Sequence, residues 1–406
     1  MRLLTTAWKA LGGRSQPHRV APGTRAGRKA RLALAASALT LALALAGPAA
    51  ASLAPDPGGD ESAQLSGPPP GKLFGFAGVR QVGDISSALA SRLVARTGGN
   101  ATRTAMHWQA LEPTRDHYRR AAFARYDHLY AALRSRGIKP VFVLQFAPAW
   151  ARDHGPPQQC GSSDACHYPP APGMLGEWRE FVRDVARRYP RAALEVWNEP
   201  NYLGQWQSGV DPARYARLLA VADAAAASVH PRMPVLMGGL ASVAKTGWWG
   251  PADFLRSAYA ATPSLAGRTD AINFHVYPTS ALGAGSEFAR LFAAIRSARA
   301  AAGDTGTPLL VSELGLSTTG PHAVDGAQQS DVILRATRRI LTMSDTLGVF
   351  VYTLVDREEL APADPERGFG VIRATAGRTG INVFPKPAYC ALRREAGASS
   401  SRSTSV

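Results

Sequence analysis

Residues 192–201 read Ala-Ala-Leu-Glu-Val-Trp-Asn-Glu-Pro-Asn. An apolar, strand-like run leads there to a glutamate, Glu199, and then to a polar, aromatic loop. A carboxylate at the end of a buried strand is costly unless something uses it. The pattern recurs at Leu309-Leu310-Val311-Ser312, a second strand-like run that is followed by Glu313. Two glutamates at two strand ends are the pair required to cleave a glycosidic bond with an acid and a nucleophile.

The chain around these two runs alternates between strand-like and helix-like segments from Phe74 onward. Short runs rich in Val, Leu, Ile, Phe and small residues are typical of strands buried on both faces. The predicted strands are Phe74–Val79, Ala101–Met106, Val141–Phe146, Ala193–Trp197, Val235–Gly239, Ala271–Val276, Leu309–Ser312 and Val349–Leu354. The predicted helices are Asp84–Arg96, Ala122–Arg136, Leu175–Tyr189, Pro212–His230, Ala252–Tyr259, Glu287–Ala302, Ala327–Thr346 and Pro387–Glu395.

Eight strand-then-helix units in one chain predict an α/β fold, a (β/α)8 TIM barrel that forms a single catalytic domain over residues 73–397. A doubly wound open sheet is the alternative. It would need a Gly-rich phosphate turn after its first strand, and Gly75-Phe76-Ala77-Gly78 is not one. In a barrel the strand ends converge on one face, so Glu199 and Glu313, at the ends of the fourth and seventh strands, should meet.

The N-terminus carries a pattern typical of export. Residues 1–31 hold eight Lys or Arg and no acidic residue, an apolar run follows from Leu32, and small residues end the segment at Ala51. Residues 1–51 are therefore predicted to be a signal peptide. An uncleaved signal anchor is the alternative, since Leu32–Ala51 is long enough to span a bilayer. Residues 52–72 are predicted to be a disordered linker, and residues 398–406 a disordered tail.

The net charge of +16 does not indicate a nucleic-acid partner. Eight of the 46 basic residues lie in the leader, which leaves 38 against 30 acidic residues and a balance of +8. No clustered basic run, which a nucleic-acid interface would need, occurs outside the leader. We expect no nucleic-acid partner, and a membrane association only if the leader stays uncleaved.

Three cysteines are consistent with an exported protein. Cys160 and Cys166 lie in one Pro/Gly-rich loop and are predicted to form a short-loop disulfide that stabilises by about 2 kcal/mol. A zinc site with His154 or His167 is the alternative, although the spacing fits no common pattern. Cys390, in a late helix-like segment, is predicted to be a small buried side chain.

The motif Trp197-Asn198-Glu199-Pro200-Asn201, together with Ser312-Glu313-Leu314-Gly315, resembles the retaining glycoside hydrolases of clan A. Within that clan the similarity points to the cellulase-like family and to the β-xylosidase/iduronidase-like family with its bacterial exopolysaccharide endoglycosidase relatives. It covers roughly residues 73–395. The resemblance implies that Glu199 is the general acid/base and that Glu313 is the nucleophile.

The chemistry favours the same division of roles. In a retaining mechanism the two carboxyls lie about 5–5.5 Å apart. An ionised Glu313 at that distance opposes ionisation of Glu199 by about 3 kcal/mol at an effective dielectric constant of 20, or about two pKa units. Glu199 is then expected to stay protonated and to donate to the leaving oxygen. Once Glu313 is esterified by the sugar its charge disappears, and Glu199 can act as a base toward water.

The resemblance also implies four further site residues. Asn198 would bind the sugar hydroxyl next to the reacting carbon. Arg103 would hold the nucleophile ionised, and a charged side chain within a strand needs such a partner. His275 and Tyr277 alternate along the sixth strand, so they point the same way and would orient the nucleophile and the sugar.

Aromatic residues gather in the predicted loops, where sugar rings could stack on them. The candidates are Trp108, Phe146, Trp150, Trp206, Trp248 and Trp249. Of these, we expect Trp150 and Trp206 first, and then Trp108, to contact the substrate. Many clan members carry a Trp at the end of the eighth strand, but residues 349–356 contain none. Either Tyr352 or Asp356 serves there, or the subsite takes a different sugar.

These patterns predict a secreted, extracellular glycosidase that acts on a polysaccharide or oligosaccharide by double displacement, as a monomer without a metal or other cofactor. A carbohydrate-binding pseudoenzyme on an inactive barrel is the alternative from another class. A metal-dependent barrel hydrolase would carry a His-x-His pair after its first strand, where the sequence is Gly78-Val79-Arg80.

Overall fold

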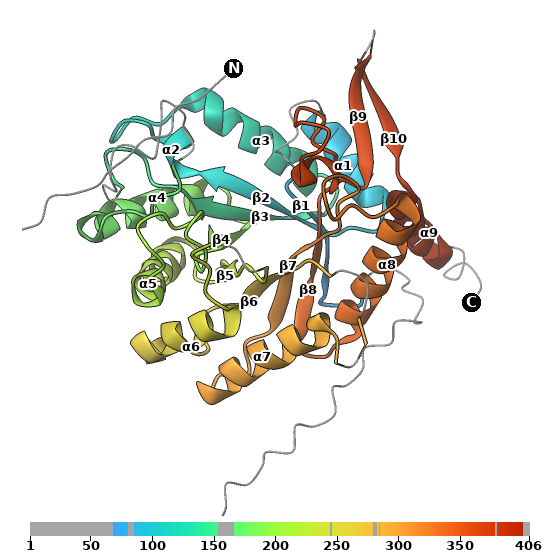
Figure 1. The fold of residues 1–406 in the computed structure, drawn as a ribbon. Helices are drawn as coiled ribbons and strands as arrows, with labels where there is room; N and C mark the ends of the chain where they lie inside the picture. Colours follow the sequence, from blue (N-terminus) through green and yellow to red (C-terminus); the bar gives the residue numbers. More distant parts are fainter. Residues whose placement is uncertain are drawn as a thin grey trace, which may run out of the picture. The chain divides into compact units, whose positions relative to one another are not determined.

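A computed structural model describes residues 68–79, 85–152, 166–243, 246–278, 282–283, 285–377 and 380–400. Its centre is a sheet of eight parallel strands (Figure 1). Neighbouring strands run in the order β5-β4-β3-β2-β1-β8-β7-β6. Their bounds are β1 Leu73–Ala77, β2 Ala101–His107, β3 Lys139–Gln145, β4 Ala193–Asn198, β5 Val235–Gly239, β6 Ile272–Val276, β7 Leu309–Leu314 and β8 Thr346–Tyr352.

Backbone hydrogen bonds also join the two outermost strands in that order. Met237 in β5 donates to the carbonyl of Ala271, and His275 in β6 donates to the carbonyl of Leu240. A parallel bridge pairs Leu240 with Phe274. The sheet therefore closes into a barrel, as the eight strand-then-helix units predicted. The carboxyl ends of β4, β6 and β7 are thereby brought to one face.

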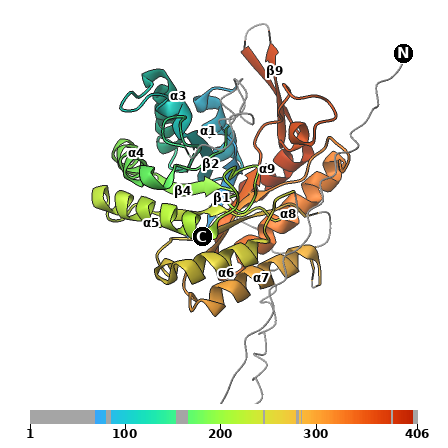
Figure 2. The ribbon, with the colours of Figure 1, turned by 60° about the vertical axis from the view of Figure 1, so that its left-hand side comes forward.

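Helices cover the outside of the barrel (Figures 1 and 2). Helix α5 begins as predicted, because Asp211 accepts from the backbone N–H of Arg214 and Pro212 occupies the first helical position. Helix α1 is capped by Ser86, and Asp84, the first residue of the predicted helix, lies outside the described residues. The helix bounds are α1 Ser87–Arg96, α2 Trp108–Leu111, α3 Arg120–Arg134, α4 Leu175–Arg188, α5 Pro212–Val229, α6 Pro251–Ala261, α7 Glu287–Ala301, α8 Gly326–Thr342 and α9 Pro387–Ser400.

Side-chain alternation along the strands divides the buried residues into two sets. Leu194 and Val196 of β4 belong to the large core between strands and helices, whereas Ala193 packs with the barrel interior. The interior of the barrel is filled by one or two residues from or next to most strands. These residues are Leu73, Ala77, Ala101, Val141, Leu236, Ala271, Leu310 and Phe350. Glu195 follows Ala193 by two positions on β4, so it also points into the barrel.

An antiparallel hairpin that the sequence did not predict follows the eighth strand. Its strands are β9 Ile372–Gly377 and β10 Gly380–Pro385. The hairpin extends away from the barrel in both views (Figures 1 and 2). It is preceded by a short 3-10 turn, η4 Pro365–Gly368. Two further short turns, η2 Pro172–Met174 and η3 Pro263–Leu265, connect other elements.

The ends of the predicted domain agree broadly with the barrel. Strand β1 begins at Leu73, and Lys72 of the expected linker donates through Nζ to the carbonyl of Met343 at 2.7 Å. Helix α9 continues to Ser400, within the expected tail. The predicted signal peptide lies outside the described residues. Among the residues that the structure does describe, no helix is long and apolar enough to cross a membrane.

Candidate active site

Glu199 and Glu313 meet at the carboxyl end of the barrel against one nitrogen of the His275 imidazole. Nδ1 of His275 lies 3.0 Å from Oε1 of Glu199 and 3.5 Å from Oε2 of Glu313. These two carboxylate oxygens are therefore no more than 6.5 Å apart, the sum of the two distances. His275 is fully buried, and each glutamate is 8% exposed. The convergence expected of residues 114 positions apart is therefore present in the fold.

The backbone of Glu199 is held in an unusual conformation. Its φ is 47°, in the left-handed region, and Trp197 two residues earlier has a φ of 76°. The N–H of Glu199 donates to the carbonyl of Gly239 at 2.8 Å. A Cβ atom at Gly239 would lie 2.3 Å from Nε2 of His275, so only glycine leaves room for the ring. Left-handed backbone at non-glycine residues is costly and gathers at functional sites.

Arg103, in β2, connects the nucleophile candidate to β4. Its Nη1 donates to Oε1 of Glu313 at 2.6 Å, and its Nη2 donates to Oδ1 of Asn198 at 2.7 Å. Its Nε and Nη2 donate to the two oxygens of Glu195 at 2.8 and 2.7 Å. Burial alone would lower the pKa of Arg103, but the charges and hydrogen bonds of Glu195 and Glu313 raise it above its ordinary value. Arg103 is therefore a permanent cation beside Glu313.

Tyr277 follows β6 and hydrogen-bonds through its hydroxyl to Oε2 of Glu313. Burial, reinforced by the negative charge of Glu313, raises the pKa of Tyr277 well above its ordinary value. The phenol is therefore protonated at neutral pH and donates to the carboxylate. Together Arg103 and Tyr277 supply one donor to each oxygen of Glu313. These two donors hold the carboxylate of Glu313 in a fixed orientation.

Tyr352, one of the two residues considered in place of the missing eighth-strand Trp, lies beside Tyr277. Its ring lies 6.4 Å from that of Tyr277 and 5.4 Å from that of Phe369. Its hydroxyl donates to Oε2 of Glu366 at 2.8 Å. Asp356, the other residue considered, is buried and accepts from Nζ of Lys386 at 3.2 Å. Tyr352 is therefore the residue that borders the site.

Two of the three tryptophans expected to contact substrate are core residues. Trp108 is fully buried, stacks on Phe181 at 5.1 Å and donates to Glu112 at 2.7 Å. Trp206 is also fully buried and packs edge-on against Trp197 at 5.1 Å. Neither ring offers a free face for a sugar. The structure does not bring these two residues to the site, because their apolar rings pack between the loops and the barrel.

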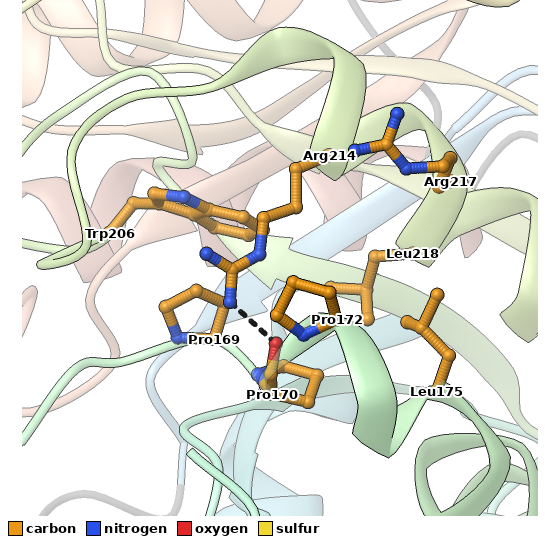
Figure 3. Close-up of a pocket in the computed structure, with 8 residues that line it drawn as sticks. All are labelled: Pro169, Pro170, Pro172, Leu175, Trp206, Arg214, Arg217 and Leu218. Atoms are coloured by element: carbon orange, nitrogen blue, oxygen red, sulfur yellow. Dashed lines mark hydrogen bonds between the residues drawn. The ribbon is translucent and has the colours of Figure 1, made fainter. Parts of the chain in front are cut away.

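Trp206 lines a separate small pocket, shown in Figure 3. Arg214 lies beside the indole at 5.9 Å and donates to the carbonyl of Pro170 at 2.7 Å. The pocket volume is about 20 Å³, room for about one water molecule. The rest of its lining comes from Pro169, Pro172, Leu175, Arg217 and Leu218. None of the predicted catalytic residues lines it.

Exposed apolar side chains concentrate in the loops beside Glu199. Trp249 is 43% exposed, Val243 42% and Leu203 40%, and these follow β4 and β5. The loops are joined directly, because the N–H of Trp249 donates to the carbonyl of Asn201 at 2.8 Å, two residues after Glu199. Trp150, in the loop after β3, is half-buried and donates to the carbonyl of Glu112 at 3.0 Å. Trp249 thus presents more ring surface than Trp150.

Sequence reasoning overlooked Glu195. The residue stands in the quoted run and was read as part of an apolar strand, yet it is fully buried and paired with Arg103. The signal was available, since a charged residue in a buried strand needs a partner, which is the reason that singled out Arg103. Gly239 was likewise read only as the end of a strand.

The cysteine and zinc predictions rest partly on residues that the structure leaves undescribed. Cys160 and His154 lie outside the described residues, so the disulfide stays a prediction. Cys166 is buried, whereas Cys390, which the sequence predicted to be buried, is only half-buried and is free. His167 stacks on Phe146 at 3.9 Å and contacts the carbonyl of Gly204 through Nδ1. Among the described residues, no group of three or more His, Cys, Asp and Glu could hold a metal ion.

Comparisons by sequence give no relative. No protein-family model matches the chain, and no curated protein matches it.

Comparison by structure finds glycoside hydrolases. A family 39 glycoside hydrolase from Bacteroides cellulosilyticus WH2 superposes with a TM-score of 0.57 at 20% identity, covering 80% of this chain and 64% of that one. A monomeric β-xylosidase from Caulobacter crescentus CB15 gives 0.55 at 22%, covering 81% and 69%. A GH5_18 protein from Streptomyces cattleya, solved with Manβ1-4GlcNAc, gives 0.53 at 19%, covering 82% of each chain. The shared feature is the fold, and this chain spans just under two thirds of the family 39 protein.

Proposed function

We propose that this protein is a retaining glycoside hydrolase in which Glu199 is the acid/base and Glu313 the nucleophile. The observation that carries the proposal is the placement of both carboxylates against Nδ1 of His275, at 3.0 and 3.5 Å. The two oxygens are therefore at most 6.5 Å apart. This upper limit is compatible with the spacing of about 5–5.5 Å between the carboxyls of retaining enzymes, and it lies at the lower edge of the range of about 6.5–9.5 Å in inverting enzymes.

The surroundings of the two carboxylates support different roles. Glu313 receives Nη1 of Arg103 and the hydroxyl of Tyr277, two donors that stabilise a carboxylate anion. Glu199 instead lies against the imidazole of His275, with Oε1 3.0 Å from Nδ1. A carboxylate that receives two donors suits a nucleophile, and a carboxyl that can hold a proton suits an acid.

In the first step the carboxylate oxygen of Glu313 attacks the anomeric carbon of the substrate. The bond from that carbon to the leaving oxygen breaks while Glu199 gives its proton to that oxygen. A glycosyl ester on Glu313 and the freed alcohol result. Arg103 and Tyr277 then lose an anionic partner, because the ester oxygen carries no charge.

In the second step Glu199, now ionised, takes a proton from water as the water oxygen attacks the anomeric carbon. The ester bond breaks, Glu313 regains its charge, and Arg103 and Tyr277 again stabilise it. Two inversions restore the original anomeric configuration. Glu199 ends the cycle protonated.

A carbohydrate chain is the substrate class we propose. Exposed Trp249 and Leu203 lie on the loops beside Glu199, where the leaving group would be, and sugar faces stack on such surfaces. The neighbours of similar fold include a β-xylosidase and an exo-β-1,4-mannosidase. We propose an oligosaccharide or polysaccharide substrate, on a protein that works as an exported monomer, in keeping with the basic and apolar leader.

A nucleophile variant tests the proposal. Glu313→Ala should lose turnover of every glycoside that the wild type cleaves, and added azide should restore cleavage of an activated aryl glycoside with a glycosyl azide of inverted configuration as product. Full activity of Glu313→Ala would refute the assignment. Sugar binding without cleavage by the wild type would support a carbohydrate-binding pseudoenzyme.

A further inference from the structure

Glu195 is a fully buried carboxylate in the middle of β4. On the flanking strands its register partners are Val143 in β3 and Leu236 in β5, both apolar. A carboxylate in such surroundings is strongly disfavoured unless it is paired and hydrogen-bonded. The proposed double displacement gives Glu195 no step, so its retention inside the barrel requires another explanation.

The contacts of Glu195 fix the orientation of Arg103. Its two oxygens accept from Nε and Nη2 of Arg103 at 2.8 and 2.7 Å, a bidentate pair. The N–H of Gly239 donates to Oε1 at 2.9 Å and anchors the carboxylate itself. A guanidinium is planar, so holding one edge determines where the remaining donors point. The remaining nitrogen, Nη1, points at Glu313.

Glu195 also shares the charge of Arg103 with Glu313. One cation faces two carboxylates, so the three groups together carry a charge of −1 when all are ionised. Glu313 therefore receives only part of the available positive charge. A carboxylate whose charge is fully neutralised is a poorer nucleophile than one that is partly neutralised. Both carboxylates also act on the pKa of Arg103. Burial lowers this pKa, but Glu195, followed by Glu313, raises it above its ordinary value.

We propose that Glu195 is a positioning residue, which aims Nη1 of Arg103 at Glu313 and keeps part of the arginine charge away from the nucleophile. The inference rests on the proposed function for its catalytic consequence, but the anchoring of Arg103 stands on the contacts alone.

The first test replaces the charge at nearly constant size. In Glu195→Gln, kcat should fall about ten- to hundredfold, with KM changed less than about threefold, because the guanidinium shifts toward Glu313. The acidic limb of the pH profile of kcat/KM should move about one unit lower, since Glu313 then receives more of the positive charge. Glu195→Asp, which restores the charge, should return the limb toward the wild-type position.

Other groups face Glu313 and are unchanged in this comparison. They are Arg103 from β2, Glu199 after β4, His275 and Tyr277 from β6 and the turn after it, and Tyr352 from β8. The matched control is Glu180→Gln on α4, an exposed carboxylate that pairs with Arg183 at 3.3 Å. It should leave kcat and the acidic limb unchanged. An acidic limb in folded Glu195→Gln that stays in place or moves higher would overturn the charge-sharing role.

The second test needs no activity. Arg103→Gln leaves Glu195 buried without its cation, so it should lower the melting temperature more than the double variant Arg103→Gln/Glu195→Gln does. If the losses in melting temperature from the two substitutions add, so that the double variant melts at a lower temperature than Arg103→Gln, the anchoring role would be overturned. A wild type that cleaves no glycoside would refute the proposed function instead, and this melting comparison would still decide whether Glu195 anchors Arg103.

Discussion

His275 and Glu199 are in direct contact, with Nδ1 of the imidazole 3.0 Å from Oε1 of the carboxylate. The imidazole comes from β6 and the carboxylate from the turn after β4, so the contact spans the intervening strand β5 at the carboxyl end of the barrel. The same nitrogen lies 3.5 Å from Glu313. One buried nitrogen thus lies within 3.5 Å of both carboxylates on which the proposed chemistry depends.

The acid role of Glu199 predicts a dependence on the leaving group. Glu199→Gln keeps the size of the side chain but cannot donate a proton as an acid. The rate on a substrate with a sugar leaving group should fall about 10²–10⁴-fold. An aryl glycoside with a strongly acidic phenol needs no protonation, so its first step should be nearly unchanged. Steady-state and burst kinetics with a series of phenols measure this, and an equal loss for all leaving groups would contradict the role.

The exposed ring of Trp249 predicts a role in holding the leaving-group sugar. In Trp249→Ala, KM for an oligosaccharide should rise about two- to tenfold, the value of one stacking contact. Hydrolysis of a glycosyl fluoride, which has no leaving-group sugar, should keep its KM. Phe384→Ala, another exposed aromatic position on the β9–β10 hairpin, is the control and should change neither. Equal changes for both substrates in Trp249→Ala would contradict this role.

A half-buried ion cluster away from the site gives a prediction about how stability depends on pH. Asp345 accepts two hydrogen bonds from Arg296 at 2.9 Å and one from Arg299 at 3.2 Å. Burial would raise the pKa of Asp345, but the two arginines outweigh it and leave the pKa below its ordinary value. The pair therefore stabilises the fold above the unfolded-state value of about 3.9, and this stabilisation is lost as the pH falls through the lower folded-state value.

Asp345→Asn should accordingly lose about 1.5–3 kcal/mol of unfolding free energy at pH 7. The difference from the wild type should shrink below about pH 4. Chemical denaturation across this pH range measures it. Asp331→Asn, which removes an exposed helical pair with Arg335 at 2.7 Å, should change stability by less than about 0.5 kcal/mol. A pH-independent loss in Asp345→Asn would contradict the ion-pair explanation.

The cysteines give a prediction that requires no substrate. If Cys160 and Cys166 are bridged, alkylation under denaturing, non-reducing conditions should modify one thiol, Cys390, which is free in the structure. Reduction before alkylation should raise the number to three. Intact mass distinguishes the two results, and three modified thiols without reduction would rule out the bridge.

The barrel could be predicted from the sequence because its signals are local. Each strand is a short apolar run, and the start of helix α5 is marked by Asp211 at the N-cap and Pro212 at the first helical position. The convergence of Glu199 and Glu313 then follows from the topology of parallel strands. The hairpin β9–β10 gave no comparable signal, because Ile372–Gly377 is short, mixes small with polar residues and buries only Ile372 and Ala374.

The rest of the site depends on tertiary contacts that no local pattern encodes. Trp108 and Trp206 have the composition of sugar-binding residues, yet the fold uses both to fill space between loops and barrel. Trp249 has the same composition and remains exposed. Glu195 could have been found by asking which acid pairs with Arg103, but the sequence alone offers many acids and no distances.

Trapping of the covalent intermediate tests the central claim most directly. The protein is incubated with a panel of 2-deoxy-2-fluoro glycosyl fluorides, which slow the second step, and the labelled protein is digested and sequenced by mass spectrometry. The account predicts a single added fluorosugar on Glu313, with none on Glu313→Ala. A label on a different residue, or turnover of a fluorosugar with an unlabelled enzyme and an inverted product, would contradict it.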